Sequence, residues 1–273
     1  MKRKIWVSVS GGRTSMTMAV EMKRRYADSL DMVFIYANTG MEHPETLDFL
    51  NRCDKYFDLG LVWLESVVHH EDRVSTTHVI TDYENSVRDT SLAEEVIKKY
   101  GIYNTSYPHC TRELKIRPME SYIKSIGWHK EGRAVGIRVD ETRRVRADAF
   151  KAGIVYPLHD WFPMTKEDVL DWWDDYPDID LRIEEHLGNC VNCWKKTDKK
   201  VFRIINDPEY SDQFDFMDRM EKEMGLAGAN KDGTHRVFWR NNRTTEIMRK
   251  TGELIGSDAE KYDSCANEEC GLD

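Results

Sequence analysis

The stretch IWVSVSGGRTS, residues 5–15, decides the fold class of this chain. Its apolar half is typical of a buried strand, and it ends in Ser10, Gly11, Gly12, Arg13, Thr14 and Ser15. Apolar residues at helical spacing follow. Two consecutive glycines allow positive φ angles and let backbone N–H groups approach an anion, while the following helix directs its positive end at the same point. The stretch therefore predicts a phosphate-binding turn between a strand and a helix.

The spacing of this turn excludes two other phosphate-binding patterns. It lacks the Gly-x-x-x-x-Gly-Lys-Ser of P-loop NTPases and the Gly-x-Gly-x-x-Gly of dinucleotide-binding folds. It resembles Ser-Gly-Gly-x-x-Ser, the pyrophosphate loop of the adenine nucleotide α-hydrolase (PP-loop) superfamily, whose members split ATP into AMP and pyrophosphate. For this motif taken alone, an ordinary glycine-rich turn is the alternative.

The composition is that of a globular protein. The 273 residues are 40% hydrophobic, with 8 Trp and 12 Tyr, which is enough for a substantial core. No apolar run approaches the length of a membrane span, and residues 1–4 precede too short an apolar stretch for a signal peptide, so we expect a cytoplasmic protein without membrane contact. The net charge of −9 argues against an extended nucleic-acid footprint and leaves room for a small anionic ligand.

Strands and helices alternate along most of the chain. We expect strands at residues 5–9, 32–36, 61–64 and 134–137, and helices after Ser15, from Pro44 and from residue 118. Capping boxes at residues 91–94 and 165–168 predict two further helices, the first ending at Gly101, and residues 102–112 read as a loop. This alternation predicts an α/β fold with a Rossmann-like doubly wound parallel sheet.

The chain changes character near residue 188. We expect a nucleotide-binding domain over residues 1–187, followed over residues 188–273 by a helical, cysteine-bearing C-terminal region. Cys190 and Cys193 form a Cys-x-x-Cys turn that can direct two thiolates at one metal. Cys53 falls within an amphipathic helix, where a small buried hydrophobe is expected. An iron–sulfur cluster, zinc and a redox dithiol all remain open for the other cysteines.

Five stretches in order resemble one family. They are residues 10–15, ANTGMEHPET at 37–46, CTRELKIRP at 110–118, GIRVDE at 136–141 and GNCVNC at 188–193. Together they look like the phosphoadenosine phosphosulfate (PAPS) reductase-like family, particularly the forms carried by bacteriophages. The resemblance implies an adenine nucleotide α-hydrolase fold that binds an adenine nucleotide, ATP or PAPS, and often a [4Fe–4S] cluster. For the polyphosphate of ATP we also expect Mg²⁺.

The resemblance also implies roles for single residues. The nucleotide would contact Ser10, Gly11, Gly12, Arg13, Thr14, Ser15, Asn38, Thr39, Gly40, Glu42 and Gly136. Arg112, Lys115 and Arg138 would contact anionic groups, Cys110, Cys190 and Cys193 would ligate the cluster, and Cys270 would be the catalytic thiol of a reductase. Beside these roles, we expect Cys265 as a further cluster ligand and Mg²⁺ near Asp140 or Glu141.

Two departures from true sulfonucleotide reductases bear on the reaction. Those enzymes have a degraded pyrophosphate loop, whereas both glycines and both serines are intact here, which favours cleavage of ATP. They end in Glu-Cys-Gly-Leu-His, whereas this chain ends with Asp273, and Cys265 offers a cluster ligand beside Cys270. They also carry an adjacent cysteine pair where this chain has Cys110 alone.

We therefore expect an enzyme that adenylates a substrate oxygen for sulfur transfer, with a sulfur donor as partner. The alternatives are a PAPS or adenosine phosphosulfate reductase, which Cys270 and a thioredoxin-like reductant would serve, and a catalytically silent partner protein that binds nucleotide and metal. The acceptor stays open among DNA, tRNA and a small metabolite, and a nucleic acid has no support from the charge.

Overall fold

The computed structural model describes residues 2–129, 131–227, 230 and 233–255. The strands are β1 (Arg3–Val9), β2 (Leu30–Ala37), β3 (Val62–Val67), β4 (Thr77–Thr81), β5 (Gly132–Val135) and β6 (Ile154–Val155). The α-helices are α1 (Arg13–Tyr26), α2 (Pro44–Phe57), α3 (Ser91–Tyr100), α4 (Arg117–Ser125), α5 (Lys166–Asp174), α6 (Asp198–Ile204), α7 (Ser211–Met224) and α8 (Thr245–Ile255).

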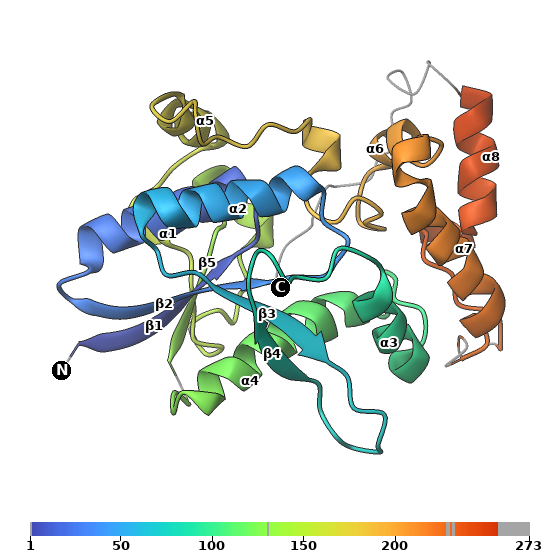
Figure 1. Cartoon of the computed structure of the whole chain (residues 1–273), viewed down its shortest axis with the longest axis horizontal. Helices are drawn as coiled ribbons and strands as arrows, with labels where there is room; N and C mark the ends of the chain where they lie inside the picture. Colours follow the sequence, from blue (N-terminus) through green and yellow to red (C-terminus); the bar gives the residue numbers. More distant parts are fainter. Residues whose placement is uncertain (1, 130, 228–229, 231–232, 256–273) are drawn as a thin grey trace.

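The strands form one sheet in the order β4-β3-β2-β1-β5-β6, in which only β4 runs antiparallel to its neighbour. Helices cover both faces, and the two faces of β1 show why. Val7 points toward the cluster that α1, α2 and α5 form, whereas Trp6 packs with Met119 and Ile123 of α4. Figure 1 shows these helices above and below the sheet. The doubly wound α/β fold predicted from the sequence is confirmed.

The C-terminal helices α6, α7 and α8 lie together at one side of the sheet, next to α3 (Figure 1). Their apolar side chains share one buried cluster with Val96 and Ile97 of α3 and with Leu114. The predicted helical C-terminal region is present. Among the described helices, none has the length and apolar character that a membrane crossing requires.

Local signals predicted some element ends and failed at others. Pro44 stands in the first turn of α2, Gly101 follows α3 with a φ of +79°, and Thr165 caps α5 in a capping box with Asp168. The capping box predicted at residues 91–94 is wrong, because Ser91 is already helical and Thr90 makes no side-chain cap. The segment predicted as a loop ends earlier than expected, in a π-helix (Cys110–Ile116), and β5 ends before Gly136.

Candidate functional site

The turn after β1 presents backbone donors without acceptors. The first hydrogen bond of α1 runs from the N–H of Met16 to the carbonyl of Gly12. Within the described chain, no acceptor meets the N–H groups of residues 11–15, and α1 has neither a side-chain cap nor an acidic residue in its first turn. Ser15 closes the turn, since its Oγ accepts from the N–H of Ser10 and lies 3.0 Å from the Ser10 Oγ. These N–H groups and the positive end of α1 can bind an anion.

The two glycines of this turn differ in backbone conformation and in the space available for a side chain. Gly11 has a φ of +83°, and a Cβ there would lie 2.5 Å from Cγ2 of the buried Thr46 in α2. Gly12 has a φ of −101° and a ψ of 159°, and a Cβ there would have no atom within 4 Å. The expectation of positive φ at both glycines is therefore wrong for Gly12, which adopts ordinary extended backbone beside open space.

The next two side chains of the turn bind protein groups. The Arg13 guanidinium makes a bidentate pair with Asp180, with Nε–Oδ1 at 2.7 Å and Nη2–Oδ2 at 2.8 Å. The Thr14 hydroxyl accepts a hydrogen bond from Nη1 of Arg138 at 3.1 Å. Arg138 thus lies at the turn, as the resemblance implies, and the turn offers a ligand mainly its backbone.

The carboxylates expected to hold Mg²⁺ are already engaged by cations. Asp140 pairs with Nε of Arg138 at 2.9 Å, and that charge lowers the pKa of its carboxyl against the opposing effect of burial. Glu141 pairs with Nη1 of Arg144 at 2.5 Å and with Arg138 at 3.4 Å. Among the residues that the structure describes, no group of three or more His, Cys, Asp or Glu side chains is arranged to hold a metal ion.

The residues after β2 shape a second loop at the same edge of the sheet. The buried Asn38 amide donates to Glu65 at 2.7 Å and to the carbonyl of Val87, which ties this loop to the segment after β4. Gly40 has a φ of +78°, and a Cβ there would collide with the carbonyl oxygen of Asp89. Asn38 and Gly40 therefore stabilise the conformation of this loop through contacts inside the protein.

Gly136 supports the turn from the other side. It follows β5, which pairs with β1, and a Cβ on Gly136 would lie 3.0 Å from the Cα of Ser15. The absence of a side chain lets the end of β5 approach the first turn of α1 closely. This position of Gly136 is a packing requirement of the phosphate turn.

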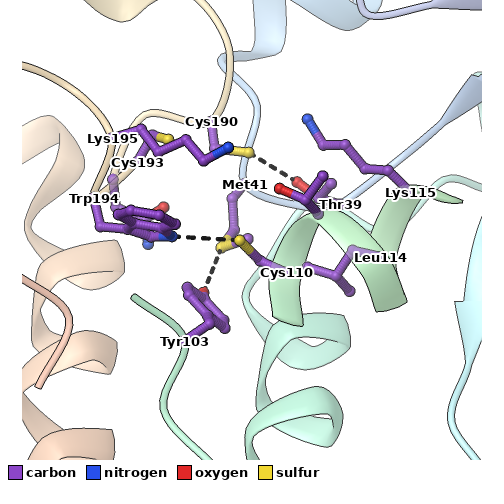
Figure 2. A pocket seen from close by; sticks show the side chains of 12 residues that line it. Thr39, Met41, Tyr103, Cys110, Leu114, Lys115, Cys190, Cys193, Trp194 and Lys195 are labelled. Atoms are coloured by element: carbon purple, nitrogen blue, oxygen red, sulfur yellow. Dashed lines mark hydrogen bonds between the residues drawn. The ribbon is translucent and has the colours of Figure 1, made fainter. Parts of the chain in front are cut away.

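Three of the predicted cysteines line one pocket. Cys110 comes from the π-helix, and Cys190 and Cys193 come from the Cys-x-x-Cys turn eighty residues later (Figure 2). Indole Nε1 of Trp194 donates to the Cys110 sulfur at 3.4 Å, and the hydroxyl of Tyr103 donates to the Met41 sulfur at 3.8 Å. The other residues that line the pocket are Thr39, Thr111, Leu114, Lys115, Asn192 and Lys195.

Sequence reasoning missed the aromatic walls of this pocket. Trp194 and Tyr103 are both buried, and burial raises the pKa of Tyr103 well above its ordinary value, so that its phenol stays neutral. Trp194 had a signal, because it directly follows Cys193. Tyr103 had none, because it stands in a segment read only as a loop.

Cys190 connects the pocket to the loop after β2. Its sulfur lies 3.3 Å from the Thr39 hydroxyl and donates to Oε1 of Glu42 at 3.7 Å, while Thr39 donates to Glu42 at 2.8 Å. Figure 2 shows the Thr39 and Cys190 side chains meeting. The backbones also pair, since the N–H of Val191 donates to the carbonyl of Met41 at 2.8 Å. The predicted rim residue Glu42 is buried and contacts a thiol here.

The predicted anion contacts Arg112 and Lys115 have different surroundings. Lys115 lines the thiol pocket. Arg112 pairs through Nε with the buried Glu113 at 2.5 Å and lies 3.2 Å from Nδ1 of His109. Burial and the charges of Arg112 and Arg236 lower the pKa of His109 to about 4, so its imidazole is neutral near pH 7.

The remaining cysteines separate into one inert thiol and two outside the described chain. Cys53 is fully buried in α2, and burial raises the pKa of its thiol, which confirms the expected small hydrophobe. Cys265 and Cys270, predicted as cluster ligand and catalytic thiol, lie outside the described residues.

Comparison with known families identifies the larger part of this chain. Residues 4–172 match the family model of the phosphoadenosine phosphosulfate reductase domain. The chain belongs to this family. The family match ends before Cys190 and Cys193, so those thiols lie in a segment outside the shared domain.

Two relatives and two solved structures are similar to this family member. The uncharacterized nin region protein ORF290 of Escherichia phage lambda is 32% identical over 207 residues, 74% of this chain and 70% of that protein. The uncharacterized protein MJ0973 of Methanocaldococcus jannaschii is 23% identical over 266 residues, 93% of this chain and 56% of that protein.

The PAPS reductase of Candida auris, in a phosphate complex, has a TM-score of 0.39 and 14% identity over 63% of this chain and 72% of that one. The U34-tRNA thiolase NcsA of Methanococcus maripaludis, with its [4Fe-4S] cluster, has a TM-score of 0.44 and 16% identity over 99% of this chain and 80% of that one.

Proposed function

We propose that this chain is an ATP-dependent sulfur-transfer enzyme. A substrate oxygen attacks the α-phosphorus of ATP, the bond to the β-phosphate breaks, and pyrophosphate leaves. A sulfide-class sulfur nucleophile then attacks the adenylated carbon, and AMP departs with the oxygen. Adenylation is needed because the oxygen alone is a poor leaving group. The observation that carries the proposal is that a thiol-lined pocket reaches Thr39, in the loop after β2. That strand pairs with β1, which leads into the phosphate turn.

The phosphate turn supports the first half of this reaction. Its five N–H groups without acceptors in the described chain suit the pyrophosphate portion of ATP, and they need no reorganisation when charge develops there. Arg138 lies beside Thr14 and adds positive charge at the rim. An intact set of backbone donors of this kind suits an enzyme that breaks the α–β bond of its nucleotide and must bind the pyrophosphate that leaves.

The thiol pocket supports the second half, and its donors fit an iron–sulfur cluster. Thiolates are the ligands of such clusters, and Cys110, Cys190 and Cys193 would hold one here. When bound, a cluster supplies iron that can accept and present sulfur or electrons. Lys115 and Lys195 line the same pocket, where they offset negative charge.

A second candidate follows from family membership. Because residues 4–172 match the PAPS reductase domain, a reductase that releases sulfite is the competing activity. In that reaction the Cys270 thiolate would attack the sulfur of PAPS, and a dithiol reductant would resolve the resulting thiosulfonate. The two activities differ in nucleotide, in product and in the need for Cys270.

One experiment separates these activities. Protein purified without oxygen is assayed for iron and sulfide. It is then incubated with ATP, hydrosulfide and a candidate acceptor (DNA, tRNA or a small metabolite), or with PAPS and thioredoxin. The proposal expects AMP and pyrophosphate from ATP in the presence of the acceptor and no sulfite from PAPS. Sulfite from PAPS, lost in Cys270→Ser, would establish the reductase instead.

The cluster is tested by single serine variants of the pocket thiols. Cys110→Ser, Cys190→Ser and Cys193→Ser should each lose most of the bound iron and the brown colour near 400 nm, about where thiolate-to-iron charge transfer absorbs. Cys53→Ser is the matched control, since Cys53 is buried in α2 away from the pocket and should keep the wild-type iron content. Stoichiometric zinc without iron in the wild type would contradict the cluster.

A further inference from the structure

Arg13 is the charged residue of the phosphate turn, and its guanidinium pairs with Asp180, which lies 167 positions later in the sequence. Asp180 accepts two hydrogen bonds from the Arg13 guanidinium, and the carbonyl of Leu181 accepts a third at 2.5 Å. Oδ1 of Asp180 also accepts from the N–H of Leu181 at 2.7 Å, which fixes the carboxylate on its own backbone. Arg13 and Asp180 keep 30% and 24% of their side-chain area exposed, so the pair is partly shielded from water.

The segment around Asp180 is fastened to the second helix that borders the turn. Nη2 of Arg52 in α2 donates to the carbonyl of Asp180 at 3.0 Å. The N–H of Arg182 donates to Oε1 of Glu45 at 3.1 Å, and Glu45 pairs with Arg52 at 2.6 Å. The same first turn of α2 carries Thr46, against which Gly11 packs. Asp180 therefore links the first residue of α1 to Arg52 of α2, and the neighbouring Arg182 adds a contact to Glu45 in the first turn of that helix.

We propose that Asp180 is a positioning residue of the nucleotide site. Its carboxylate fixes the first turn of α1 through Arg13 and directs the guanidinium away from the cradle, so that backbone N–H groups bind the phosphates. This inference rests on the proposed function, because it assigns Asp180 to the same nucleotide site. A bidentate Arg–carboxylate pair is suited to this role because two parallel hydrogen bonds set orientation as well as distance.

The arrangement predicts that the contribution of Arg13 to the phosphate turn depends on Asp180. Removing either partner should loosen the same turn, and removing both should do little more than removing one.

The test is a double-mutant cycle on full-length protein. Asp180→Asn, Arg13→Met and the double variant are titrated calorimetrically with inorganic pyrophosphate and with ATP, and their melting temperatures are recorded. Asp198→Asn is the matched control, since Asp198 makes a bidentate pair with Arg243 at 2.6 and 2.8 Å, is similarly shielded, and lies in α6. It reports the effect of losing such a pair elsewhere in the fold.

Each single variant should bind pyrophosphate about tenfold more weakly, and the double variant should match the singles within about threefold. Asp198→Asn should keep the wild-type affinity whatever its melting temperature. Unchanged affinity in folded Asp180→Asn would overturn the inference, and so would a loss in Arg13→Met that simply adds to the loss in Asp180→Asn. If Asp180→Asn does not fold, unchanged affinity in Arg13→Met overturns it equally. A wild type that binds neither ligand would instead refute the proposed function, and this inference with it.

Discussion

Replacing Gly11 and Gly12 one at a time by alanine should give opposite effects on stability. A side chain at Gly11 meets two obstacles. Its φ of +83° lies where an L-residue costs about 1–2 kcal/mol, and its Cβ would lie 2.5 Å from Cγ2 of Thr46, a distance that real contacts do not reach. Thr46 is 1% exposed in the first turn of α2, so it cannot move aside freely. Overpacking of this kind costs about 1–3 kcal/mol.

The free energy of unfolding should therefore fall by about 2–5 kcal/mol in Gly11→Ala. Gly12→Ala meets neither obstacle, because Gly12 has extended backbone and open space around its Cβ direction. Alanine at such a position removes freedom from the unfolded chain and should raise the free energy of unfolding by about 0.4–1 kcal/mol. The proposed function places phosphate in that open space, so pyrophosphate affinity should nevertheless fall in Gly12→Ala.

Urea unfolding followed by tryptophan fluorescence measures the two changes, with the slopes compared to check that the transitions are alike. Calorimetric titration with pyrophosphate then separates stability from binding. A free energy for Gly11→Ala within about 0.5 kcal/mol of wild type would refute the geometric argument. Equal destabilisation of both variants would refute it as well, since it would mean that the two glycines serve the turn in the same way.

Two further substitutions test groups outside the turn. Gly136→Ala should destabilise the protein by about 1–3 kcal/mol, measured by the same urea unfolding, because its Cβ would press on the backbone of Ser15, which cannot rotate away. Burial raises the pKa of Glu221 from 4.5 to about 7, so the folded state binds more protons than the unfolded state between these values, and the free energy of unfolding should fall as pH rises through this window. Glu221→Gln should flatten that fall, and an unchanged slope from pH 5 to 7.5 would show that Glu221 is not its source.

The sequence predicted the sheet because its strongest signals are local. Continuous apolar strands and the turn at residues 10–15 need no partner to be recognised, and Pro44 and Gly101 mark helix ends through their own backbone preferences. The strands that escaped notice are edge strands. β4 leaves Val79 and Ile80 half exposed, and β6 has two residues, so neither carries a buried apolar run. The π-helix escaped because its segment has no helical apolar period.

In the candidate site, too, residues with a local sequence signal could be predicted, and residues whose partners are distant in sequence could not. The turn residues and the Cys-x-x-Cys pair could be predicted because their chemistry lies in adjacent residues. The role of Glu42 could not, because its contact with Cys190 joins residues 148 positions apart. Asp180 was invisible for the same reason. It ends an acidic stretch that reads as a solvated face, and only the fold brings it to Arg13.

Two of the pocket thiols depend on contacts between segments that are far apart in the sequence. Cys110 is held by the indole of Trp194, and Cys190 is held by Thr39 and Glu42. These two thiols are thus positioned by groups from another part of the sequence, and the C-terminal region shares its apolar cluster with α3. The Cys190 thiol takes this orientation through the loop after β2, which belongs to the sheet domain. The predicted boundary at residue 187 therefore divides the chain by composition, whereas the site is assembled across it.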